Sequence, residues 1–279
     1  MQDINPHSSA SGDGPYRPGQ EDIDASKAPL MDHLIELRQR MIYAIAGIGV
    51  GFLICFYFAD QLFLLLVKPY QWAVKWATGE TDVKLIQTGA PEFFFTQLKL
   101  ALFGATCLSF PNIALQVYKF VAPGLYKDEK EAFRPYLIAT PVLFIIGAAI
   151  VYFIVTPFMM YFFVKMQVTT GPIKIVLEQR VSEYLSLIMT LILGFGVCFQ
   201  LPVVLSLLAR AGFINGDQLR TFRRYAIVGI AAVAAVMSPP DPFSMIAMMT
   251  PTILLYEASI FIVDRIAKSR EARASMTDV

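Results

Sequence analysis

The feature that most constrains this chain is a series of long apolar runs that are almost free of charged residues. Six apolar runs occur, and only the last contains a charge, at Glu257: 41–59, 100–118, 135–164, 184–209, 225–240 and 242–263. A helix needs about 20 apolar residues to cross the hydrocarbon core of a bilayer. The composition agrees with a membrane environment, because 56% of the residues are hydrophobic and 16% are charged. We therefore predict an all-α polytopic membrane protein with six transmembrane helices.

The last two helices are predicted to be shortened. The fifth run ends in Ser238-Pro239-Pro240-Asp241, where the two prolines stop one helix just before the next begins. A helix of about 16 residues covers only about 24 Å, so this pair either thins the bilayer or leaves a cavity at the turn. The helices expected in a membrane domain of residues 29–265 are 40–60, 93–118, 135–164, 183–209, 224–238 and 242–263. We expect residues 1–28 to be a disordered tail and 266–279 a second tail.

The distribution of Lys and Arg predicts the orientation. Sixteen of the 23 lie in the two terminal segments and in alternate loops, and six lie in the loops of the other side. The positive-inside rule then places both termini in the cytoplasm. Lys99 is the remaining one, near enough to the outer surface to extend its ammonium towards it. Trp72 and Trp76 are predicted to anchor a short helix at the outer interface.

Two acidic spots fall on the predicted cytoplasmic side. Glu36 lies in the amphipathic segment 31–40 before the first apolar run, and the sequence KDEKE at 127–131 follows the second run. One interpretation is local, with Glu36 paired to Arg40 at i,i+4 and the charged loop pairing with itself. The other is that the two spots flank one patch, where carboxylates would bind two guanidinium groups in bidentate forks.

Other classes of function are disfavoured. No GxSxG, HExxH, P-loop or GxGxxG motif occurs, which argues against an enzyme. Two histidines and three isolated cysteines predict no metal site, and we expect no cofactor. A net charge of +1 gives no basic surface for nucleic acid. Within the membrane, Gln200 and Glu257 are the polar candidates, and a solute transporter using Lys99, Asp241 and Glu257 is the alternative from another class. A purely structural scaffold is a third possibility.

Four ordered segments together carry a family resemblance. PLMDHLIELRQR precedes the first helix, QVYKFVAPGLYKDEK follows the second, FGVCFQLPV lies in the fourth and MSPPDPFS joins the fifth to the sixth. With these, the chain resembles the TatC family over about residues 29–265. That family provides the core receptors of the twin-arginine protein translocase. The resemblance implies a receptor for signal peptides of folded cargo and a scaffold for their export, driven by the proton-motive force.

The resemblance also implies where the signal peptide binds. The glutamate of the HLIELR segment is Glu36, and the glutamate that follows LYK is Glu129, so these would be the two arginine-binding carboxylates. Phe120 corresponds to the phenylalanine that precedes this loop. Arg38 and Arg40 would shape the same surface.

Further implications concern loops, partners and location. Pro69 and Asp241 match positions where the family is sensitive to change. The implied partners are the single-span proteins TatA and TatB, beside helices five and six, together with membrane lipid and other copies of the chain in a homo-oligomer. The implied location is the bacterial inner membrane. One departure is Gln200, which stands where many relatives have Glu and can donate hydrogen bonds but supplies no charge.

Overall fold

The computed structural model describes residues 20–80, 82–121, 134–167, 177–238 and 242–277. The chain forms nine α-helices, one π-helical segment and two short strands in that described part. In chain order they are α1 (Gln20–Tyr57), α2 (Ala59–Thr78), β1 (Leu85–Ile86), α3 (Glu92–Val121), α4 (Arg134–Ile150), η4 (Val151–Val155), α5 (Thr156–Lys165), β2 (Gln179–Arg180), α6 (Val181–Cys198), α7 (Leu201–Arg210), α8 (Gly216–Met237) and α9 (Pro242–Thr277).

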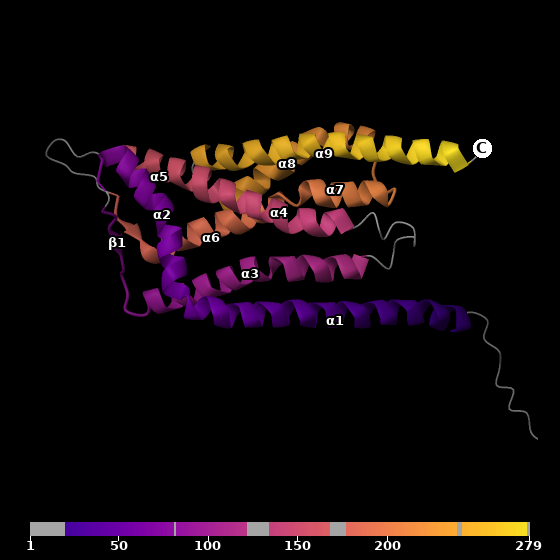
Figure 1. The fold of residues 1–279 in the computed structure, drawn as a ribbon, viewed down its shortest axis with the longest axis horizontal. Helices are drawn as coiled ribbons and strands as arrows, with labels where there is room; N and C mark the ends of the chain where they lie inside the picture. Colours follow the sequence, from indigo (N-terminus) through magenta and orange to yellow (C-terminus); the bar gives the residue numbers. More distant parts are fainter. Residues whose placement is uncertain (1–19, 81, 122–133, 168–176, 239–241, 278–279) are drawn as a thin grey trace, which may run out of the picture.

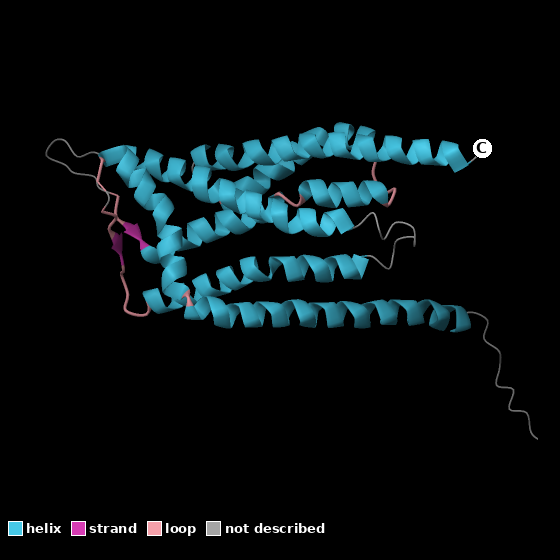
Figure 2. Cartoon of the chain, viewed as in Figure 1, coloured by secondary structure: helices cyan, strands magenta, loops and turns pink. Residues whose placement is uncertain are grey.

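The helices form an elongated bundle (Figures 1 and 2). Five stretches in the described part are long and apolar enough to span a membrane: His33–Tyr57, Glu92–Phe120, Pro135–Lys165, Val181–Arg210 and Ser244–Lys268. Figure 1 shows α1 beginning and α9 ending at the same end of the bundle, while α2 and β1 lie at the other end. The predicted all-α polytopic membrane fold is therefore confirmed.

The fifth expected span corresponds to α8. Three arginines, Arg220, Arg223 and Arg224, occupy its first turns, so only its second half is free of charge. This explains why α8 is not among the five stretches long and apolar enough to span. The sixth span differs from the expectation in length, because α9 continues as a helix to Thr277. The Pro-Pro turn at 239–241 lies outside the described residues.

Two expected helices are interrupted, and in each case a proline explains why. The expected helix 183–209 divides at Phe199-Gln200, just before Pro202. A proline ring collides with the carbonyl four residues earlier, and that residue is Cys198, where α6 ends. The expected helix 135–164 contains the π-helical segment η4, which ends two residues before Pro157. At the N-terminus, α1 begins at Gln20, so residues 20–28 are helical where a disordered tail was expected.

The main core lies where α2 crosses the ends of α5 and α6. Tyr184 and Phe195 of α6 are completely buried there, and the residues around them come from α2, α3, η4 and α5. Trp72 of α2 packs edge-on against Tyr152 and stacks on Phe153. Aromatic packing on η4 therefore holds Trp72. A parallel pairing of β1 with β2 closes this end of the bundle.

A second, smaller cluster joins α8 to α9 and α7. Its buried members are Ala209, Leu219, Tyr256, Ile260 and Val263. The hydroxyl of Tyr256 donates a hydrogen bond to the Leu219 carbonyl over 2.8 Å. The bundle thus has two separate packing centres, one at each end.

Candidate functional site

The candidate site begins on the polar end of α1. Arg40 donates a hydrogen bond from Nη2 to Oε1 of Glu36 over 3.0 Å, and each side chain is 29% exposed. The Nε of Arg40 is buried and has no hydrogen-bond partner among the described residues. Arg38 is exposed on the same helix. The local ion pair expected from the i,i+4 spacing is therefore present.

Antiparallel packing of α1 against α3 fixes what lies beside this pair. Ser109 donates to the Gly47 carbonyl over 2.8 Å, and Asn112 donates to the Tyr43 carbonyl over 3.2 Å. Gly47 allows the close approach, because an added Cβ would lie 2.4 Å from the Asn112 side-chain nitrogen. This register brings the C-terminal end of α3 to the N-terminal half of α1.

Phe120 is located where that register predicts. Its ring stacks on the imidazole of His33 with 4.4 Å between centroids and 22° between planes. His33 precedes Glu36 by three residues on α1, so the two side chains share one face of the helix. Phe120 and Glu36 therefore belong to one surface. Glu129 lies outside the described residues, in the segment that leaves α3 immediately after Val121.

Gln200 occupies the break between α6 and α7. Its amide nitrogen donates to the carbonyls of Thr140 and Gly196, over 3.1 and 3.2 Å. Its Oε1 is buried without a partner among the described residues. The side chain lines a cavity of about 250 Å³ whose other walls, such as Val117 and Leu207, are mainly apolar. Gln200 thus bridges α4 and α6 beside an apolar cavity.

Glu257 and Lys99 lie on different pairs of helices. Glu257 of α9 accepts a hydrogen bond from Arg223 of α8 over 2.8 Å, which makes it a paired residue at the α8–α9 contact. Lys99 instead lines a groove between α3 and α6. Asp241 lies outside the described residues. The structure therefore does not join Lys99 and Glu257 into the pathway that the transporter alternative requires.

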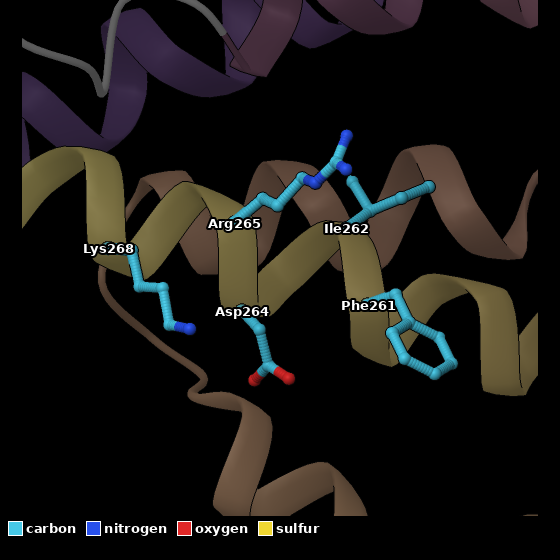
Figure 3. Close-up of a pocket in the computed structure, with 5 residues that line it drawn as sticks. All are labelled: Phe261, Ile262, Asp264, Arg265 and Lys268. Carbon is cyan, nitrogen blue, oxygen red and sulfur yellow. The ribbon is translucent and has the colours of Figure 1, made fainter.

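The C-terminal half of α9 carries an open pocket of about 580 Å³ (Figure 3). Figure 3 shows Asp264 and Lys268 pointing to one side of the helix and Arg265 to the other. Asp264 is paired with Arg220 of α8. The two cations of this pocket thus do not converge on one ligand.

Pro69 lies inside helix α2 and is buried. A proline has no N–H, so the carbonyl four residues earlier, that of Leu65, loses its helical partner. The hydroxyl of Tyr152 donates to this carbonyl over 2.8 Å, and the buried hydroxyl of Tyr184 donates to the next one, Leu66, over 2.8 Å. Tyr70 of α2 packs beside the ring of Tyr184. Its burial there raises the pKa of its phenol above the ordinary value.

Sequence reasoning missed these two tyrosines and His33. The free carbonyl could have been predicted, since every proline inside a helix leaves one four residues back. The donor that reaches it comes from a helix more than 80 residues later, and nothing in the local pattern identifies it. Among the described residues, no group of three His, Cys, Asp or Glu side chains could hold a metal ion.

Comparisons with known proteins decide the family. The family model described as Sec-independent protein translocase protein (TatC) matches residues 32–251. The chain belongs to the TatC family. A TatC protein of Magnetococcus marinus is 40% identical over 235 residues, which cover 84% of this chain and 83% of that protein. The TatC protein of Escherichia coli is 36% identical over 233 residues, covering 84% and 87%.

Solved structures of TatC show the same fold. A crystal structure of the twin-arginine translocase receptor TatC superposes with a TM-score of 0.73 at 35% identity, covering 84% of this chain and 99% of that one. The present TatC-family chain is therefore a multi-pass membrane protein of a protein translocase. The described site residues Glu36, Arg38, Arg40, Phe120, Gln200 and Pro69 all lie within the matched range.

Proposed function

We propose that this chain is the signal-peptide receptor of a twin-arginine translocase. Its binding surface comprises Glu36, Phe120, Arg38 and Arg40, completed by Glu129 in the segment after α3. The observation that carries the proposal is the stack of Phe120 on His33. This contact holds the end of α3 against the face of α1 that bears Glu36, and the acidic residues at 127–131 follow that end of α3 in the sequence.

The chemistry of the surface fits a pair of consecutive arginines. A guanidinium and a carboxylate form two parallel charge-assisted hydrogen bonds, which lysine cannot reproduce with the same geometry. Glu36 already holds a guanidinium, that of Arg40, in a partly exposed ion pair. We propose that Arg40 is the resting counter-ion, which an arginine of the signal peptide replaces.

The remaining features of the proposal concern the assembly. The chain resides in the bacterial inner membrane with both termini in the cytoplasm, and export of folded cargo uses the proton-motive force. The single-span proteins TatB and TatA pack along α8 and α9, where Val228 and Val236 expose 68% and 87% of their surface. Several copies of the chain then contribute to one complex.

The test combines crosslinking with export. A photoreactive group beside the two arginines of a signal peptide is expected to label α1 near Glu36 and the segment around Glu129. Replacing both glutamates by Gln is expected to reduce crosslinking and export of a twin-arginine reporter by roughly tenfold or more, because each bond to a charged group contributes about 1.5–3 kcal/mol. Glu80→Gln is the matched control, since Glu80 is exposed at the opposite end of the bundle.

Two outcomes would refute the receptor proposal. One is labelling that falls away from both glutamates. The other is undiminished export when both are replaced, which a purely structural scaffold predicts.

A further inference from the structure

A groove of about 310 Å³ opens between α3 and α6, at some distance from the surface around Glu36. Its lining includes Lys99 and Leu102 of α3 with Ser186, Met189, Thr190 and Leu193 of α6. Lys99 and Thr190 are exposed, and Ser186 is half-buried. The groove lies within two helical stretches that can span the membrane, so its opening faces lipid.

The depth of each lining residue follows from one contact. Ser182 at the start of α6 donates a hydrogen bond to Glu92 at the start of α3, over 2.5 Å. Both helices then run away from this end of the bundle. Lys99 lies about 10 Å below the contact, and Ser186 and Thr190 lie about 6 and 12 Å below it, at 1.5 Å per residue. These three polar groups therefore occupy one band, near the end where α2 crosses the bundle (Figure 1).

The polar groups of this band lack partners, unlike comparable groups elsewhere. Six hydroxyls in the spanning helices donate to the carbonyl four residues earlier: Thr96, Thr106, Ser206, Thr250, Thr252 and Ser259. Within the described ranges, Lys99, Ser186 and Thr190 make no hydrogen bond or ion pair. The groove thus presents one ammonium and two hydroxyls that remain free to donate.

Lys99 lies at a depth where a cation must pair with an anion or reach the lipid headgroups. Charged side chains inside the bilayer are costly unless they pair or reach the interface, and the lysine stem is long enough to carry its ammonium towards the headgroups. The ligand that fits must offer oxygen acceptors and a negative charge at the level of Lys99. Deeper in the groove, Leu102 and Leu193 offer apolar surface. An acceptor-rich head above an apolar tail is the pattern of a glycerophospholipid.

We propose that this groove is a phospholipid-binding site, in the leaflet on the side where α2 and the two strands lie. Lys99 binds the phosphate, Ser186 and Thr190 donate to phosphate or ester oxygens, and one acyl chain lies along Leu102, Met189 and Leu193. The bound lipid neutralises Lys99 and fills the space between α3 and α6.

The affinity is tested on the full chain in detergent. Native mass spectrometry with added phosphatidylglycerol is expected to show a bound phospholipid whose affinity falls about tenfold in Lys99→Gln, the size of a lost bond to a charged group. Lys99→Arg keeps the charge and is expected to retain most of the binding. Lys75→Gln is the control, because Lys75 is exposed on α2 away from this groove. Equal affinity in the wild type and Lys99→Gln would overturn the proposal.

The position of the acyl chain is tested separately. Phosphatidylglycerol with a photoreactive group in mid-chain, in proteoliposomes of the full chain, is expected to label the peptides that contain Leu102 and Leu193. Labelling falls in Lys99→Gln and persists in Lys99→Arg and Lys75→Gln. Two outcomes would contradict a phospholipid site. One is labelling that does not change when Lys99 is replaced. The other is complete displacement of the lipid by inorganic phosphate, which would mean that the acyl chain adds nothing to binding.

Discussion

At Glu36 the carboxylate is already occupied by a guanidinium of its own helix. The ion pair with Arg40 is partly exposed, and such pairs contribute little to stability. Arg40 is also not fully satisfied, because its Nε is buried without a partner among the described residues. A weak, incompletely bonded counter-ion is easily exchanged, which suits a carboxylate that must accept an arginine from another chain.

Arg40→Gln is therefore expected to tighten binding of a twin-arginine signal peptide. The change removes a competitor for Glu36, and the gain is about two- to fivefold if the pair is worth about 0.5–1 kcal/mol. The measurement is a titration of labelled signal peptide against the purified chain. Arg180→Gln is the control. It breaks a comparable local ion pair, the i,i+3 pair of Arg180 with Glu183, at the opposite end of the bundle. An unchanged affinity in Arg40→Gln would count against its role as resting counter-ion.

Among the elements, α2 shows how a defect in one helix becomes a contact with another. Pro69 frees the Leu65 carbonyl, and η4 supplies the hydroxyl of Tyr152 to occupy it. The bond is made next to Trp72, which packs on the same tyrosine. Losing the proline would restore a helical partner to this carbonyl and remove the free acceptor that docks α2 on the bundle.

Tyr152→Phe is expected to destabilise the protein by about 0.5–1.5 kcal/mol, since it removes a hydrogen bond that docks η4 on α2. Thermal unfolding in detergent measures the effect. Tyr161→Phe is the control, because the Tyr161 hydroxyl makes no hydrogen bond within the described part. In a Pro69→Ala background the Leu65 carbonyl regains a helical N–H, so Tyr152→Phe should then cost less. The same cost in both backgrounds would mean that the hydroxyl does not serve this carbonyl.

For the whole molecule, the two ends of the bundle differ in kind. One end carries α2, the strand pair and the main core. The other end carries the Glu36 surface, the start of α1, the end of α9 and most of the arginines. The charge distribution predicts that the arginine-rich end faces the cytoplasm. That orientation is required for the Glu36 surface to meet a signal peptide before export.

Cysteine labelling tests this orientation. With Cys55, Cys107 and Cys198 replaced, a single cysteine at Glu80 is expected to react with an impermeant maleimide from outside the inner membrane. A single cysteine at Lys119, exposed at the other end of α3, is expected to react only after that membrane is permeabilised. The reverse pattern would invert the topology and rule out the proposed receptor surface.

The sequence by itself determined the helical class, the six apolar segments and the i,i+4 pair of Glu36 with Arg40. Each of these depends on residues within a few turns of one another, and a bilayer makes hydrophobic run length nearly sufficient to identify a spanning helix. The breaks near Pro157 and Pro202 were not predicted, although a missing N–H acts locally and the prolines were visible in the sequence. The sequence did not locate η4 or the end of α9 at Thr277.

The tertiary structure alone decided which distant groups meet. Phe120 lies on His33, Tyr152 binds the carbonyl released by Pro69, Glu257 pairs with Arg223, and Lys99 faces Ser186 and Thr190 across a groove. These contacts depend on which helices pack together and in what register. Small residues such as Gly47 and hydrogen bonds between helices set that register, and hydropathy encodes neither of them. The segment containing Glu36 was identifiable from the chain, but the surface it belongs to required the packing of α1 against α3.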